Sequence, residues 1–215
     1  MASKGSCKYC NFIQGNSSLV YDSVIDETEN FVVVPTLGSL LPGWQLICPK
    51  THYLNTTMLN QNEKLEFNNL LAQRIKATFD LYQKQVVVFE HGAVVDNSLV
   101  GCGIDHAHVH ILPVDFDFLE AVKSNEVSFS SLELDNISDF YLNNTIDDKP
   151  YWICSVVGEE VLFSSDMEAT SQFFRKIIAK ELNKEGNFDY KEFSYVENAV
   201  KTISDFSNLS VKLAV

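Results

Sequence analysis

The chain has 215 residues, of which 46% are hydrophobic and 12% aromatic, enough for the core of one domain or of one domain with an extension. Its 29 acidic residues outnumber its 16 basic ones, and the net charge of −13 argues against the basic surface that general nucleic-acid binding requires. No apolar run approaches the roughly 20 residues that cross a bilayer, and residues 1–10 are polar, so we expect a cytoplasmic protein with no membrane partner.

Cys7 and Cys10 form a C-x-x-C pair near the start of the sequence. Five cysteines without a signal region do not indicate a disulfide framework, and only six residues precede Cys7, where a thioredoxin-like motif would need a strand. A tetrahedral zinc site needs two more thiolate or imidazole ligands, and His52 and His106 are candidates. The alternative is a pair of ordinary cysteines in a polar turn.

Two apolar runs, 31–35 and 44–48, predict strands. They are separated by turn residues at 41–43 and lie close in sequence, so we expect an antiparallel pair. His52 follows the second strand, and its candidacy as a ligand depends on its meeting the other candidates in space.

A helix is predicted from about residue 60 to residue 84. Asn60 and Glu63 have the spacing of a capping box at its start. Apolar residues recur on one approximate face, and Arg74 and Lys76 fall outside it. These two charges are therefore expected to be solvated.

Histidine then occurs at every second position in His106-Ala-His108-Val-His110-Ile-Leu. Because a strand repeats every two residues, the three imidazoles should share one face and the apolar residues between them the other. Three neighbouring imidazoles must be hydrated, hydrogen-bonded or bound to a metal. Such an imidazole on a rigid strand is a good nucleophile near neutral pH, and phosphoryl transfer through a phosphoramidate suits it.

The residues before this run are candidates for contact with an oxyanion. Gly101 and Gly103 flank Cys102, and glycine lets backbone amides approach an anion closely, although simple turn glycines are the alternative. Residues 85–89 predict a neighbouring strand of the same sheet. Glu90, at its end, would then lie near the histidines.

The chain changes character after Pro113. Residues 115–144 are acidic and show no clear pattern, whereas 151–163 predict a hairpin that turns at Gly158 and Glu159. No linker marks a firm domain boundary.

Two further helices are predicted near the C-terminus. The first starts at a capping box formed by Ser165 and Glu168 and ends near Leu182. The second is amphipathic, runs from residue 195 to residue 206 and turns four apolar residues inward: Val196, Ala199, Val200 and Ile203.

The run from His106 to Leu112 resembles the signature of the histidine triad (HIT) family, His-φ-His-φ-His-φ-φ with φ apolar. The resemblance covers about residues 7–113 and includes the Pro49-Lys50-x-His52 segment before the helix. It implies an α+β, HIT-like fold with a mainly antiparallel sheet and packed helices. It also implies a nucleotide hydrolase, or else a nucleotidyltransferase, that acts on the α-phosphate of a small nucleotide substrate such as a dinucleoside polyphosphate or a nucleoside phosphoramidate. Relatives are often homodimers, so a homodimer is expected.

The resemblance assigns a role to each histidine of the triad. His108 would be the nucleophile that takes up the nucleoside monophosphate, and His110 would contact the phosphate or assist the leaving group. His106 would position its neighbours or bind zinc. In zinc-bearing members the ligands match Cys7, Cys10, His52 and His106, so a structural Zn²⁺ and no organic cofactor are expected.

The chain also departs from the family pattern. Cys102 and Gly103 stand where many members carry Gln followed by Ser or Thr, and Glu90 stands where Asn is frequent. With Gly101 they are the candidate nucleotide-binding residues. These departures leave a second hypothesis open, in which the chain is a catalytically weak nucleotide-binding or interaction protein that retains the HIT fold. A third hypothesis is a hydrolase with a catalytic metal on all three triad histidines.

The resemblance divides the chain at about residue 115. We expect residues 1–115 to form the HIT-like catalytic domain and residues 116–215 to form an α/β extension packed on it. Gln172 to Ile178 resembles the extensions of larger bacterial members. In it, Arg175 or Lys176 would lie near a phosphate or, alternatively, be solvated charges on a helix face.

Overall fold

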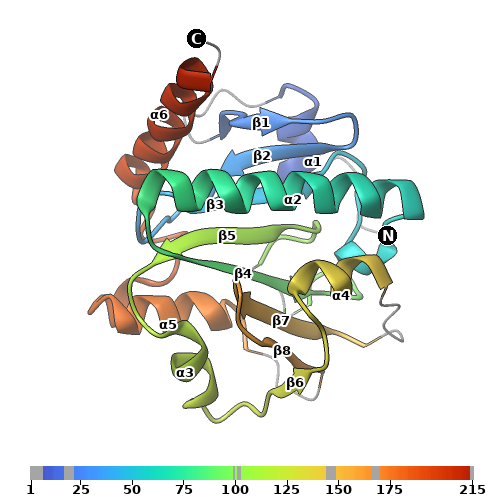
Figure 1. The fold of residues 1–215 in the computed structure, drawn as a ribbon, viewed down its shortest axis with the longest axis vertical. Coiled ribbons are helices and arrows are strands. Elements are labelled where there is room, and N and C mark those ends of the chain that lie inside the picture. Colours follow the sequence, from blue (N-terminus) through green and yellow to red (C-terminus); the bar gives the residue numbers. More distant parts are fainter. Residues whose placement is uncertain are drawn as a thin grey trace.

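The computed structural model describes residues 7–16, 22–98, 100, 103–143, 149–165 and 170–213, with side chains up to residue 209. Within these ranges the strands form one eight-stranded sheet in the order β1-β2-β3-β5-β4-β7-β8-β6 (Figure 1). The strands are β1 Asp26–Glu27, β2 Phe31–Pro35, β3 Gln45–Pro49, β4 Gln85–Gly92, β5 Val109–Val114, β6 Ser130–Leu132, β7 Tyr151–Val156 and β8 Val161–Ser164.

Six α-helices and two short 3-10 helices in the described residues accompany the sheet. They are α1 Lys8–Ile13, η2 Thr56–Met58, α2 Gln61–Tyr82, α3 Phe118–Lys123, α4 Ile137–Asn143, α5 Phe173–Glu181, η3 Glu185–Asn187 and α6 Val196–Leu213. Every strand pair is antiparallel. The predicted α+β class is therefore confirmed. No helix in the described residues is long and apolar enough to cross a membrane.

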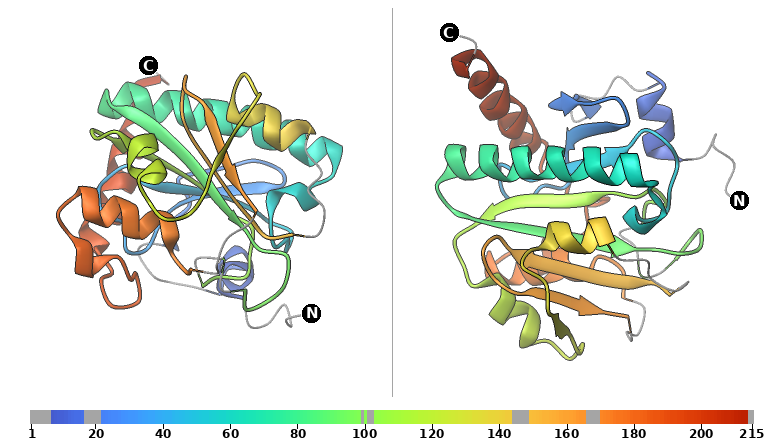
Figure 2. Two further views of the ribbon diagram at one scale, coloured as in Figure 1. Left: turned by 90° about the horizontal axis from the view of Figure 1, so that it is seen from below. Right: turned by 45° about the vertical axis from the view of Figure 1, so that its right-hand side comes forward.

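The sheet has a hydrophobic cluster on each face. On one face α2 and α4 pack over Val86 and Val88 of β4. On the other face α3 and α5 pack over Val87 and Phe89 of the same strand, and α1 lies on this side as well (Figure 2). The alternation within one strand shows how the two-residue repeat separates the two cores.

Strand β5 lies between β3 and β4 near the middle of the sheet. His110 pairs in register with Leu46 on one side and Phe89 on the other. The strand begins only at Val109, so His106 and His108 precede it rather than lying in it. The backbone of Ala107 donates instead to the carbonyl of Tyr53 at 2.6 Å, a contact that helps to hold this segment extended beside the loop after β3.

The strands of residues 116–165 continue the sheet beyond β4. Strand β7 pairs with β4 over six residue pairs, from Val87 with Val156 to Gly92 with Tyr151. The predicted hairpin of β7 and β8 is confirmed. The division into residues 1–115 and 116–215 stays a prediction.

Helix α2 begins as predicted. The Asn60 side chain accepts from the backbone of Glu63, and the Glu63 carboxylate accepts from the backbone of Asn60 at 2.9 Å, which completes the capping box. The apolar face was expected to consist of Leu65, Leu70, Leu71, Ile75 and Phe79. This prediction was less accurate, because Leu65 and Phe79 are about half exposed.

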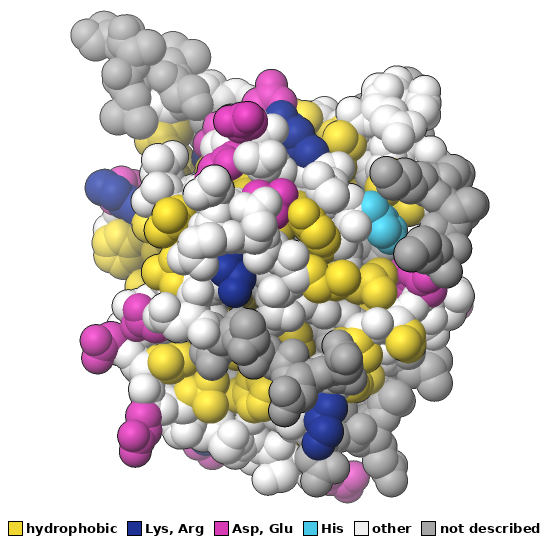
Figure 3. Space-filling model, turned by 90° about the vertical axis from the view of Figure 1, so that its right-hand side faces the viewer, with side chains coloured by type: hydrophobic (Ala, Val, Ile, Leu, Met, Phe, Trp, Pro, Cys, Tyr) yellow, Lys and Arg dark blue, Asp and Glu magenta, His cyan; other side chains and the backbone are white. Residues whose placement is uncertain are grey.

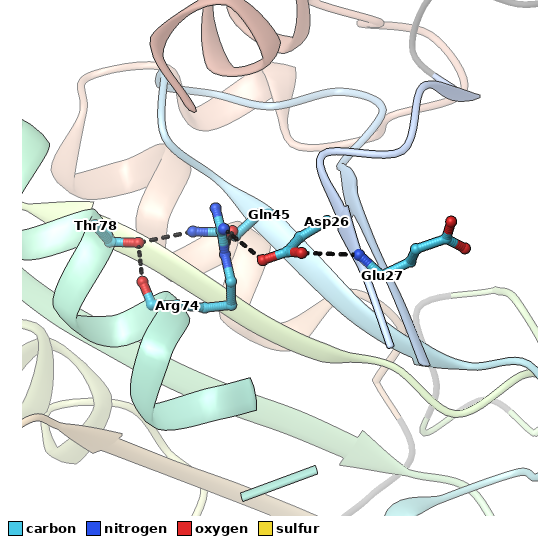
Figure 4. Close-up of polar contacts among 5 residues, drawn as sticks. All are labelled: Asp26, Glu27, Gln45, Arg74 and Thr78. Carbon is cyan, nitrogen blue, oxygen red and sulfur yellow. Dashed lines mark hydrogen bonds and ion pairs between the residues drawn. The ribbon is translucent and has the colours of Figure 1, made fainter. Parts of the chain in front are cut away.

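The expectation that Arg74 is solvated was wrong. Its side chain is buried between α2 and the sheet, where Nε donates to Gln45 Oε1 at 2.9 Å and a terminal nitrogen donates to Asp26 Oδ2 at 3.1 Å (Figure 4). The ring of Phe206 on α6 lies 4.4 Å from the guanidinium carbon. These partners come from β3, β1 and α6, so helical spacing within α2 could not reveal them.

The two C-terminal helices differ from their predicted bounds. Helix α5 begins at Phe173, after Gln172 in a left-handed conformation with no side-chain cap, and not at Ser165. The predicted partner Glu168 lies outside the described residues. Helix α6 extends to Leu213, and Val200, expected to face inward, is 43% exposed.

Candidate functional site

Four side chains with metal-binding atoms converge beside α1. Cys7 and Cys10 come from the start of this helix, His52 from the loop after β3 and His106 from the segment before β5. Their ligand atoms all lie within 4.8 Å of one another. These are the four residues expected to bind zinc, and the structure brings all of them together.

The spacing within this tetrad fits a tetrahedral zinc ion. Cys7 Sγ and Cys10 Sγ lie 3.4 and 3.6 Å from His106 Nδ1, and Cys10 Sγ lies 3.4 Å from His52 Nδ1. Zinc–sulfur and zinc–nitrogen bonds of about 2.3 and 2.05 Å at a tetrahedral angle would place such atoms about 3.5 Å apart. The donor set is therefore compatible with zinc.

A hydrogen bond orients His106 toward this position. Its Nε2 lies 2.8 Å from the carbonyl oxygen of Pro49, so we assign the proton to Nε2. The Nδ1 lone pair then faces the two cysteines. A second partner that fixes the tautomer is typical of histidines that bind metals.

His108 has the opposite tautomer. Its Nδ1 lies 2.7 Å from the carbonyl oxygen of His106, an acceptor that requires a proton on Nδ1. The lone pair is therefore on Nε2. Burial lowers the pKa of His108 below its ordinary value, so this nitrogen is unprotonated at neutral pH. Such an imidazole can act as a nucleophile.

His110 is oriented by Trp44. The indole Nε1–H donates to His110 Nδ1 at 3.0 Å, which places the imidazole proton on Nε2. The ring also stacks on Phe89 with centroids 4.2 Å apart. Burial lowers the pKa of His110 well below its ordinary value, and the positive charge of Arg175 acts in the same direction, as would protonation of His108 or His91. His110 is thus a neutral hydrogen-bond donor at neutral pH.

A pocket opens over His108 and His110. Its cavity volume is small, about 20 Å³. Its described lining residues come from both halves of the chain: Lys8, Tyr9, Thr36, Leu37, Leu46, Ile104, His108, His110, Arg175 and Tyr190. Lys8 and Arg175 are cationic and none of the ten has a carboxylate, although the whole chain carries a net charge of −13. The pocket is therefore suited to an anion.

The face shown in Figure 3 carries charges of both signs. On the face shown in Figure 3, Lys and Arg side chains are scattered among acidic and apolar ones and form no continuous basic stripe. This is consistent with the exclusion of general nucleic-acid binding from composition.

The structure describes two of the four candidate nucleotide-binding residues. Gly101 and Cys102 lie outside the described residues. Gly103 has a φ of +81°, and a Cβ built on it would lie 3.3 Å from the hydroxyl of Tyr190, so this glycine packs close to a pocket residue. A nucleotide contact at Gly103 stays a prediction.

Glu90 of β4 is completely buried. Its carboxylate accepts from the Thr56 backbone at 2.8 Å, the Thr56 hydroxyl at 2.6 Å and the Tyr151 hydroxyl at 2.8 Å. The side chain joins η2 to β4 and β7 and is not among the described residues that line the pocket. Burial raises the pKa of Glu90 to about 7, although these hydrogen bonds act in the opposite direction. A role for Glu90 in nucleotide binding stays a prediction.

The raised pKa predicts a pH-dependent cost in stability. Because folding raises the pKa of Glu90 from 4.5 to about 7, its favourable contribution is complete below pH 4.5 and is lost as the pH rises toward 7. Glu90→Gln cannot ionise. Relative to the wild type, its free energy of unfolding should therefore rise by about 2–3 kcal/mol between pH 5 and pH 8.

Urea unfolding at pH 5, 6.5 and 8 measures this difference. Tyr141 and Tyr151, the titratable neighbours of Glu90, have pKa values raised by burial and stay neutral over this range. The exposed Glu159→Gln is the matched control and should give a constant difference. A Glu90→Gln curve parallel to that of the wild type would contradict the prediction.

Sequence reasoning missed several residues of the site. Trp44 was placed only as a strand residue, and Lys8, Tyr9 and Tyr190 were not named as pocket residues. Lys176, the other extension cation considered, lies outside the pocket. The aromatic and basic character of these positions was visible in the sequence, but Lys8 and Tyr190 line one pocket from positions 182 residues apart (190 − 8), and no local pattern encodes such a separation.

No family model matches the sequence, and no match was found among curated proteins. Solved structures do match part of the chain. A HIT-like protein from Bartonella henselae is 17% identical, with a TM-score of 0.44, over 53% of this chain and 79% of that one. A hypothetical histidine triad nucleotide-binding protein from Sulfolobus tokodaii is 21% identical, with a TM-score of 0.42, over 52% and 71%.

A HIT family hydrolase from Clostridium thermocellum is 20% identical, with a TM-score of 0.40, over 52% of this chain and 94% of that one. At these identities and TM-scores the similarity carries no information on function. The solved structures similar to about half of this chain are repeatedly named as HIT or histidine triad proteins, the family that the motif around His108 resembles.

Proposed function

We propose that this chain is a nucleotide hydrolase or nucleotidyltransferase of the histidine triad type, with hydrolysis favoured and His108 as the nucleophile. The observation that carries the proposal is the pair of opposite tautomers in one anion-suited pocket. His108 presents a lone pair on Nε2, and His110 presents a proton on Nε2. A nucleophile beside a neutral donor is what attack on a phosphate ester requires.

The reaction proceeds in two displacements. His108 Nε2 attacks the α-phosphorus, the bond from phosphorus to the leaving group breaks, and its electron pair departs with that group. The imidazole becomes cationic in this adduct, and its Nδ1–H remains hydrogen-bonded to the carbonyl of His106. His110 donates to a non-bridging phosphate oxygen. Water or another acceptor then attacks phosphorus, the electron pair of the N–P bond returns to His108, and the proton of the acceptor passes to solvent.

Zinc has a structural role in this proposal. Cys7, Cys10, His52 and His106 would hold it, and it would fix the segment whose carbonyl orients His108. The described metal-ligand group contains His106 but neither His108 nor His110. This arrangement favours a structural metal over a catalytic metal on all three triad histidines. A homodimer and a cytoplasmic location stay predictions.

Capture of the covalent intermediate tests the proposal. The protein is incubated with dinucleoside polyphosphates, nucleoside phosphoramidates and nucleotide sugars, and nucleoside monophosphate release is measured. Quenching at alkaline pH preserves a phosphoramidate for intact-mass measurement and peptide mapping. We expect one nucleoside monophosphate per chain, attached at His108.

The absence of both release and adduct across this panel would refute the enzymatic proposal. Binding of nucleoside monophosphates by calorimetry would then favour the alternative, a nucleotide-binding protein that retains the fold. An adduct mapped to His110 would keep the reaction class and overturn the assignment of the nucleophile.

A further inference from the structure

The C-terminal half of the chain places a permanent positive charge in the pocket. Arg175 is the third residue of α5, is 1% exposed and lines the pocket together with His108 and His110. Its Nε donates to the carbonyl of Phe188 at 3.0 Å, and a terminal nitrogen donates to the carbonyl of Gly38. A buried guanidinium held in this way has a fixed direction.

The turn after β2 packs closely against Arg175 and the segment around Tyr190. Gly38 has a φ of +68°, and a Cβ built on it would lie 2.8 Å from a terminal nitrogen of Arg175 and 2.7 Å from Tyr190 Cα. Its backbone N–H donates to the carbonyl of Ser194 at 2.7 Å. Nearby, Lys184 Nζ donates to the carbonyl of Leu40 at 2.9 Å. The position of Arg175 is therefore fixed by several contacts between the two halves.

Arg175 also contacts the residue that orients His110. Its guanidinium carbon lies 5.0 Å from the ring centroid of Trp44, whose N–H donates to His110. Together with burial, the charge keeps His110 neutral. His110 therefore offers no imidazolium that could protonate a departing amine. A phosphate leaving group needs no such proton, because it departs as an anion that a neighbouring cation can stabilise.

We propose that Arg175 determines the leaving-group specificity of this pocket, favouring substrates from which His108 displaces an anionic phosphate chain over those from which it displaces a neutral amine. The inference rests on the proposed function. In the displacement the N–P bond forms and the P–O bond breaks, and the electron pair goes to the departing oxygen, next to Arg175. For an amine, the P–N bond breaks and water must supply a proton.

A comparison of two adjacent cations tests this role. Arg175→Gln removes the charge in the pocket, and Lys176→Gln removes an equal charge whose ammonium lies over Phe188, outside the pocket. For each variant kcat/KM is measured with a diadenosine polyphosphate and with adenosine phosphoramidate. The ratio of the two constants in one sample does not depend on the folded fraction, so a partly unfolded variant remains informative.

We expect Arg175→Gln to lower this ratio by roughly tenfold or more, because a charge-assisted contact to the leaving group is lost. Lys176→Gln should leave the ratio within about twofold, since that charge lies where solvent screens it. Arg175→Lys should give an intermediate ratio, because it keeps the charge and loses the planar fork. An Arg175→Gln ratio equal to that of the wild type would overturn the inference.

Binding separates failure of this inference from failure of the proposed function. In a His108→Asn background, the Kd values of diadenosine polyphosphate and AMP are compared with and without Arg175→Gln. If Arg175→Gln weakened the binding of the polyphosphate more than that of AMP, and the wild type showed no turnover, Arg175 would remain an anion-binding residue and the enzymatic proposal would be rejected. Turnover with an unchanged ratio would reject only the role of Arg175. If the wild type showed no turnover and Arg175→Gln did not selectively weaken polyphosphate binding, both the proposed function and the role of Arg175 would be rejected.

Discussion

His108→Asn should lower nucleoside monophosphate release by roughly 1000-fold or more, because asparagine cannot form the N–P bond on which the proposed route depends. The variant should still bind nucleotide, since Lys8, His110 and Arg175 remain in the pocket. The measurement is single-turnover release with the best substrate of the panel, together with adduct detection by mass.

The matched control is His91→Asn. His91 lies beside His110, with ring centroids 6.1 Å apart, and is buried like the triad, but it is not among the described residues that line the pocket. Its loss disturbs similar aromatic packing without removing the nucleophile, so we expect release within about tenfold of the wild type. If both variants lost nucleoside monophosphate release to the same extent, with unchanged circular dichroism, the loss would be due to disturbed packing, and His108 would be rejected as the nucleophile.

The parts of the fold that the sequence predicted correctly are those in which neighbouring residues determine the structure. The capping box at Asn60 and Glu63 needs only a spacing of three residues and is present as predicted. The alternation around His110 separates the two faces of the sheet through a two-residue repeat. The zinc tetrad is different, because it joins residues 7, 10, 52 and 106. Residue chemistry could only nominate these four ligands, and the family resemblance supported them as one set.

The errors concern residues whose partners are distant in the sequence. Arg74 and Arg175 both lie on helices. Arg74 was expected to be solvated, and a solvated charge was one of the two alternatives for Arg175. Each is buried because carbonyl, amide or carboxylate oxygens from other elements accept its hydrogen bonds. The desolvation of an arginine is tolerated only with such partners, and helical periodicity contains no information about them. The start of α5 was misplaced for a related reason, since no side chain caps it.

Removal of the metal should destabilise the protein more than it impairs the chemistry. We expect the purified chain to contain about one zinc per chain, and chelation to lower the melting temperature by about 10 °C. A structural zinc would join three separate segments here, so its loss should cost several kcal/mol, and 1 kcal/mol shifts Tm by about 2–4 °C in a chain of this size. Metal content by mass spectrometry and thermal unfolding with and without chelator measure both effects.

Cys10→Ala and Cys48→Ala form a matched pair for this test. Both remove a buried thiol from the same small cluster, but only Cys10 belongs to the tetrad. Cys10→Ala should lose the zinc and become insensitive to chelator, whereas Cys48→Ala should keep both the metal and the chelator sensitivity. Retention of one zinc by Cys10→Ala would contradict the assigned ligands.

The activity of Cys10→Ala separates a structural from a catalytic metal. A structural ion acts through His106, whose carbonyl orients His108, so its loss should loosen the nucleophile and reduce turnover by a factor well short of the His108→Asn loss. It should also leave the covalent adduct detectable. If turnover and adduct both vanished in a metal-free chain that remained folded, the metal would take part in the reaction and the nucleophile assigned to His108 would have to be withdrawn.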